Sequence, residues 1–223
     1  MATLKDVVHQ LKEEVTGGRS TDDSVISDEF LADCANNART KLIRQNESKL
    51  KPARDLIQHF CVPMSMEDAS LCCGWEAKCK VLRSTNKLPK TLATGEHSSG
   101  LFYVTSLDGL TGTRYNIVGP GEASIKPKYN QKIAFEQAGY LFLGPVNMTS
   151  NLIEKVLVFV IPENPIDWYE IEECEGDCGD PWDRDFIPTH YVEDLKRIVW
   201  ADVFAQMKQI KKDTHNNADD GTS

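Results

Sequence analysis

The spacing of apolar residues changes its period twice along this chain of 223 residues. Near the start, apolar residues recur every three or four positions, as on one side of a helix. From about residue 56 to residue 162, short runs of β-branched and aromatic residues alternate with turn signals. Beyond residue 187 the helical spacing returns. The pattern therefore predicts an α+β fold with helices at both ends and strands in the middle.

Two helices are predicted at the N-terminal end. The first covers residues 4–15 and ends at Gly17-Gly18, since glycine commonly terminates helices. The second begins at Ser27, whose side chain can cap the first turn, and Asp28 and Glu29 suit the positive end of the helix dipole. It ends before Pro52. Its expected inner face consists of Phe30, Leu31, Cys34, Ala35, Ala38, Leu42 and Ile43.

The central third of the chain reads as strands. The strand-like stretches are 56–62, 79–82, 100–107, 115–118, 132–134, 140–142 and 156–161. Turn signals such as Asp108-Gly109 and Gly144-Pro145 separate them, which is typical of an antiparallel sheet or a small sandwich. Residues 150–155 are compatible with a short helical turn before the last strand.

These patterns divide the chain into four segments. We expect a helical segment at 1–54, a β-rich domain at 55–162, an acidic aromatic loop at 163–186, and a C-terminal helix with a flexible polar tail at 187–223. Pro188 and Thr189 suit the start of that last helix. The tail is too polar to build a core of its own.

Charge and hydropathy exclude several function classes. The net charge of −9 argues against nucleic acid as the main partner. The longest apolar run, 156–162, is far shorter than the roughly 20 residues that a membrane helix needs. The first residues lack the pattern of a signal peptide, so we expect folding in a cytoplasm. The seven cysteines are an odd number and are expected to be thiols.

Catalytic motifs are absent from the sequence. No phosphate loop, GxSxG or HExxH pattern occurs, so we expect no catalytic residue and no cofactor. Zinc is a minority hypothesis because the cysteine spacings fit structural zinc sites poorly. The cysteines concerned are Cys72, Cys73, Cys79, Cys174 and Cys178.

Two stretches of opposite charge are the candidate interaction sites. A basic stretch runs from Arg39 to Arg54, and an acidic stretch with interleaved aromatic residues runs from Glu163 to Asp185. Aromatic residues are enriched at protein interfaces, so a partner-facing surface is favoured over a merely solvated loop. The candidate interface residues are Arg39, Arg44, Trp168, Tyr169, Glu172 and Trp182.

A cysteine-bearing strand-like stretch runs into a Leu-Arg-Ser turn and Leu88-Pro89 within residues 79–90, and residues 102–109 follow as another strand-like stretch and turn. These two segments resemble structural proteins of crAss-like bacteriophages and related phages of Bacteroidetes. The C-terminal segments 186–191 and 212–220 are similar to their helix start and their ending. Together these four segments comprise 35 of the 223 residues, and they lie between residues 79 and 220.

The resemblance implies a virion protein without catalytic residues, a subunit of a ring in the phage neck that connects the portal and head to the tail. It implies as partners other copies of the chain, in a cyclic ring of about twelve, together with portal, neck and tail proteins. Phage DNA would be near, and assembly would take place in the host cytoplasm. Two alternatives stay open: a nucleic-acid-binding or other minor accessory protein of the particle, and a cysteine-dependent or metal enzyme.

Overall fold

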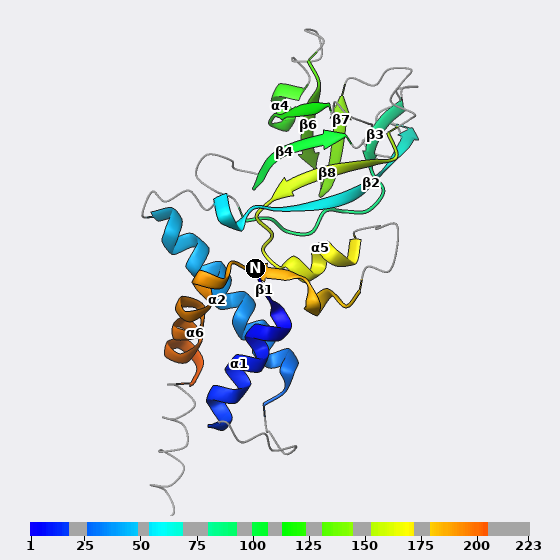
Figure 1. Cartoon of the computed structure of the whole chain (residues 1–223). Coiled ribbons are helices and arrows are strands. Elements are labelled where there is room, and N and C mark those ends of the chain that lie inside the picture. The colour runs from blue at the N-terminus through cyan, green and yellow to red at the C-terminus, as the bar shows by residue number, and fades with distance from the viewer. Residues whose placement is uncertain are drawn as a thin grey trace, which may run out of the picture. The chain divides into compact units, whose positions relative to one another are not determined.

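A computed structural model describes residues 1–17, 26–48, 54–68, 80–92, 100–106, 113–123, 131–144, 153–171 and 179–204. The chain forms two compact units (Figure 1). Unit 1 consists of Met1–Asp55 and Trp182–Ser223, and unit 2 consists of Leu56–Pro181. Unit 1 is therefore built from both ends of the sequence, and unit 2 from the middle.

Three helices form the body of unit 1. They are α1 (Leu4–Thr16), α2 (Asp28–Ser48) and α6 (Val192–Val199), and α2 contacts both of the others. Ser27 caps α2 as predicted, because its Oγ accepts a hydrogen bond of 3.2 Å from the Phe30 backbone. The predicted pair of N-terminal helices is confirmed. The placement of Phe30 on the inner face was wrong, since this residue is 38% exposed.

A short two-stranded antiparallel sheet joins the two ends of the chain. It pairs β1 (Ala2–Thr3) with β9 (Asp185–Ile187). Short 3₁₀ turns flank β9, namely η5 (Pro181–Asp183) and η6 (Thr189–Tyr191). The C-terminal helix α6 continues into a π-helical turn, η7 (Trp200–Phe204). The predicted polar tail lies outside the described residues.

Unit 2 is a closed barrel of seven strands. Going around the barrel the order is β2-β3-β7-β6-β5-β4-β8 (Figure 1). Only β5 and β6 run parallel; every other neighbouring pair is antiparallel. The strands are β2 (Gln58–Asp68), β3 (Lys80–Ser84), β4 (Leu101–Ser106), β5 (Arg114–Ile117), β6 (Ile133–Gln137), β7 (Tyr140–Gly144) and β8 (Lys155–Val160). Three short helices accompany them: η1 (Arg54–Leu56), α4 (Pro120–Ala123) and α5 (Pro165–Ile171).

The long strand β2 explains why the sheet closes instead of forming a sandwich. Its first half, 58–63, pairs with β8, and its second half, 64–68, pairs with β3. One strand thus belongs to both sides of the sheet, which removes both free edges. The α+β class and all seven predicted strands are confirmed. The expected sandwich is replaced by a barrel, and the parallel pair was not predicted.

One end of the barrel is sealed by a strap of residues 88–92 and by α5. Leu88 joins the apolar core, and the Leu92 amide donates to the Ile161 carbonyl over 2.9 Å. The Trp168 indole of α5 is buried and donates to the Lys90 carbonyl over 3.3 Å. The stretch expected as an acidic loop, 163–186, thus contains α5, η5 and β9.

Gly100 fits tightly against this strap. Its φ is +66°, and a Cβ atom there would lie 2.6 Å from the Leu92 carbonyl oxygen and 2.7 Å from the Thr91 side chain. Gly139 also has a positive φ of +82°, but its nearest neighbour, Lys87, would lie at an ordinary 3.8 Å. A side chain at Gly139 would therefore introduce backbone strain alone, whereas a side chain at Gly100 would add steric overlap with the strap.

We expect Gly100→Ala to lower the free energy of unfolding of unit 2 by roughly 2–4 kcal/mol, from strain plus overlap. Gly139→Ala should cost about 1 kcal/mol from strain alone. Denaturant titration of the full-length chain measures both. Equal losses for the two variants would contradict the close approach of the strap.

A polar network ties α1 to α6 in unit 1. The Lys196 ammonium contacts the Glu14 carboxylate at 2.8 Å and the Glu193 carboxylate at 2.6 Å. The other Glu14 oxygen accepts a bond of 2.6 Å from the Trp200 indole. The Lys196 hydrogen bond is the main cause that lowers the pKa of Glu14, and burial opposes it.

A carboxyl group with a lowered folded-state pKa stabilises the fold above its unfolded-state pKa, and this contribution is lost as the pH falls through the folded-state value. We therefore expect Glu14→Gln to reduce the stability of unit 1 by about 1 kcal/mol at neutral pH, because the pair is partly exposed. The difference in stability between Glu14→Gln and the wild type should vanish in acid. Helical circular dichroism during denaturant unfolding at several pH values measures it. Glu13→Gln, at an exposed neighbour, is the control; an identical pH profile for both variants would disprove the assignment.

Candidate interaction surfaces

The basic stretch on α2 does not form one basic face. Arg39 is fully buried: its Nε donates to the Phe186 carbonyl over 3.1 Å, and its guanidinium lies 5.7 Å from the Phe186 ring centroid. A buried charge is costly unless it is paired or hydrogen-bonded. The Arg39 side chain thus holds α2 against the backbone of β9.

The other described cations of this stretch face elsewhere. Lys41 pairs with Asp202 of η7 at 2.5 Å. Arg44 is exposed. Lys49 and Lys51 lie outside the described residues. A helix turns by about 100° per residue, so Arg39 and Arg44 lie on different sides of α2. Of the two basic candidates, Arg39 and Arg44, only Arg44 has an exposed side chain, and its contact with a partner stays a prediction.

The acidic aromatic stretch is divided between the two units. In unit 2, Trp168 is fully buried, 5.1 Å from the Phe60 ring, and Tyr169 packs at 5.2 Å from the same ring. In unit 1, Trp182 of η5 is half-buried. Glu172 lies outside the described residues. That these residues meet a neighbouring subunit stays a prediction. Tyr169 and Trp182 are the described residues among them whose side chains are partly exposed.

A row of three aromatic rings and one arginine on the outside of the barrel was not predicted from the sequence. It crosses four strands and consists of Arg114 (β5), Tyr103 (β4), Phe159 (β8) and His59 (β2), and we call it the aromatic row. The Tyr103 and Phe159 rings stack with centroids 3.9 Å apart and planes 20° apart. The Arg114 guanidinium lies 4.9 Å from the Tyr103 centroid, and the His59 ring lies 5.7 Å from that of Phe159. Such cation–π and aromatic pairs stabilise neighbouring strands.

Part of this row could have been found from the sequence. The alternation in β8 marks Phe159 as outward-facing, because Val158 and Val160 on either side of it are buried. The position of Tyr103 depends on a bulge, because Leu101 pairs with Val160 and Tyr103 pairs with the adjacent Phe159. Neither the bulge nor the order of the strands around the barrel can be read from one sequence.

The described residues offer no cluster of side chains for metal binding. They contain no group of three or more His, Cys, Asp or Glu side chains placed to hold a metal ion. Burial raises the pKa of the Cys34 thiol, which makes it a poor nucleophile. The cysteines of the zinc hypothesis, from Cys72 to Cys178, lie outside the described residues. None of the described helices is both long and apolar enough to cross a membrane.

The comparison with protein families decides the identity. The model of the family CrAss_Ring_2, described as phage tail ring protein 2, matches residues 4–222. The chain belongs to this phage ring-protein family. The resemblance to crAss-like phage ring proteins is therefore confirmed, and the family places the chain among structural components of the virion. No curated protein matches the chain significantly.

Membership in the ring-protein family gives a context to the segments that first suggested it. Residues 80–84 of the first segment form β3, and its Leu88, Pro89 and Lys90 belong to the strap that closes the barrel. Residues 102–106 form most of β4. Residues 186–191 span β9 and η6. The described family segments thus build the framework of both units.

Because Trp168 is fully buried, its removal should affect the fold directly. We expect Trp168→Ala to lower the free energy of unfolding of unit 2 by roughly 3–5 kcal/mol, through the cavity against Phe60 and the loss of the indole hydrogen bond to the Lys90 carbonyl. Denaturant unfolding of the monomer measures the loss. Tyr169→Ala, at a half-buried position beside it, should cost clearly less. A Trp168→Ala chain of unchanged stability would show that the indole does not seal the barrel.

Proposed function

We propose that this chain is a subunit of a closed homo-oligomeric ring in the neck of a tailed phage particle, between the portal and the tail. The observation that carries the proposal is the family match over residues 4–222, described as a tail ring protein. The family description of a tail ring protein supports a structural role. The chain needs no cofactor and performs no catalysis in this proposal.

A ring of identical subunits requires two different, complementary surfaces on each copy. In the proposal, the acidic aromatic stretch with Tyr169, Glu172 and Trp182 supplies one of them. The counterpart expected from the sequence is the exposed side of α2 at Arg44. Portal and other neck proteins would contact the two open faces of the ring, which is located in the virion and assembled in the host cytoplasm.

A nucleic-acid-binding accessory protein is the weaker alternative. Its support was the basic stretch of α2, and two of those cations are engaged within the chain, Arg39 with Phe186 and Lys41 with Asp202. The net charge of −9 also opposes attraction to phosphate backbones. Phage DNA near the ring would pass it without specific contacts.

Native mass spectrometry of the purified chain tests this proposal. With a subunit mass of 25.0 kDa, a ring of about twelve copies would be on the order of 300 kDa. Trp182→Ala should weaken the assembly more than a conservative substitution at an exposed position, such as Glu122→Gln in α4. A chain that stays monomeric at every concentration would contradict the proposal, as would tight binding to duplex DNA at physiological salt.

A further inference from the structure

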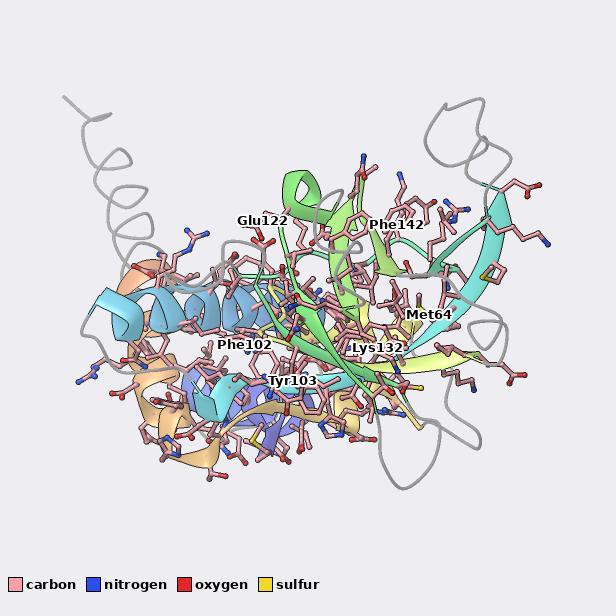
Figure 2. The ribbon with its side chains drawn as sticks, turned by 90° about the horizontal axis from the view of Figure 1, so that it is seen from above. Met64, Phe102, Tyr103, Glu122, Lys132 and Phe142 are labelled. Carbon is pink, nitrogen blue, oxygen red and sulfur yellow. The ribbon has the colours of Figure 1, made fainter. Side chains whose placement is uncertain are left out.

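The outer face of the barrel around the aromatic row carries positive charge and no carboxylate. The strand segments that form it, 58–63, 101–106, 114–117 and 155–160, contain no aspartate or glutamate, in a chain with 34 acidic residues. Arg114 is exposed, and Lys132, also exposed, reaches the neighbouring Thr113 hydroxyl over 2.8 Å. Figure 2 labels Tyr103 and Lys132 on this part of the barrel. The Arg114 guanidinium forms no ion pair with any described residue.

The middle of this face is apolar. Leu157 of β8 lies between Cys61 of β2 and Thr105 of β4 in the strand register, and all three are half-buried. Together with Tyr103 and Phe159 they form a half-exposed apolar centre, with Arg114 and His59 at its rim. An apolar centre with a charged rim is the usual organisation of a protein interface.

The stacking of the rings favours a protein partner over a nucleic acid. The neighbours of β4 in the barrel are β5 and β8, so Tyr103 lies between the Arg114 guanidinium and the Phe159 ring. Its two ring faces are therefore occupied. Single-stranded nucleic acids bind by stacking bases on free aromatic faces, which Tyr103 does not offer.

The acidic counterpart lies on α5 of the same unit. Glu163, Asp167 and Glu170 carry their charges close together, and α5 contains no lysine or arginine. Burial, then the neighbouring Glu170 and Glu163, raise the pKa of Asp167, although its hydrogen bond from Asn164 opposes them. None of the three carboxylates forms an ion pair with a described residue. The sequence continues this acidic character through Glu172 and Glu173.

We propose that the aromatic row of one copy receives the acidic α5 segment, residues 163–171, of the next copy. The inference rests on the proposed ring and names the surface that meets the acidic stretch in place of α2. Both patches lie within unit 2, and among the described residues they form no ion pair with each other. A second copy would supply the opposite charge to each patch. Repetition of this contact between two different surfaces around a symmetry axis gives a closed ring.

A charge reversal tests the contact. In the full-length chain, Arg114→Glu should weaken self-association by roughly tenfold or more, because close interfacial charge pairs contribute more than 1.4 kcal/mol. Lys87→Glu is the matched control, since Lys87 is also an exposed cation over a tyrosine ring of unit 2, 5.9 Å from the Tyr140 centroid. Sedimentation over a range of concentrations measures the dissociation constants, and denaturant unfolding confirms that each variant is folded.

A charge swap supplies the second arm. Glu170→Lys alone should also weaken association, and the double variant with Arg114→Glu should recover most of the loss. If Arg114→Glu assembles like the wild type while Arg44→Glu does not, the acidic segment meets α2. This inference is then wrong, while the proposal that the chain forms a ring still holds. A wild-type chain that never assembles overturns both proposals. Binding of a single-stranded oligonucleotide that Arg114→Glu abolishes would assign the row to nucleic acid and overturn self-docking.

Discussion

The barrel of unit 2 depends on one strand that serves two neighbours. β2 pairs with β8 as far as Pro63 and with β3 from Met64 onward, and this change of partner closes the sheet. Closure satisfies the backbone of every strand and leaves no edge for unintended pairing between copies. It also fixes the outward side chains of β4, β5 and β8 in one rigid pattern. The aromatic row and the strap of residues 88–92 both follow from that closure.

The two units are stabilised in different ways. Unit 2 relies on alternating apolar side chains that fill the barrel and on the buried Trp168 at its end. Unit 1 adds ion pairs between elements distant in sequence, such as Lys5 with Asp183 at 3.0 Å and Lys12 with Asp28 at 2.7 Å. Exposed pairs of this kind contribute little singly, and salt weakens them. The buried Arg39 attaches α2 to β9 through a hydrogen bond to the Phe186 carbonyl that is shielded from solvent.

The local patterns in the sequence were sufficient for most elements. The alternation in Lys155–Val160 and the cap at Ser27 are local signals, and the structure agrees with both. The start of α5 was also readable: Asn164 accepts a hydrogen bond from the Ile166 amide, and Pro165 occupies the first helical position. The inward position of Arg39 and the stacking of Tyr103 on Phe159 could not be predicted, because both depend on partners far away in the sequence.

The split origin of unit 1 has a consequence for the order of events during translation. Its N-terminal helices need β9 and α6 as packing partners, and these leave the ribosome only after all of residues 56–181. The barrel can therefore acquire its native structure while unit 1 is still incomplete, since domains fold as they emerge. Each nascent polypeptide thus carries all residues of the barrel while its helical unit still lacks β9 and α6. Any association that needs both units begins only when synthesis is nearly over, whereas a contact made by unit 2 alone requires only the barrel.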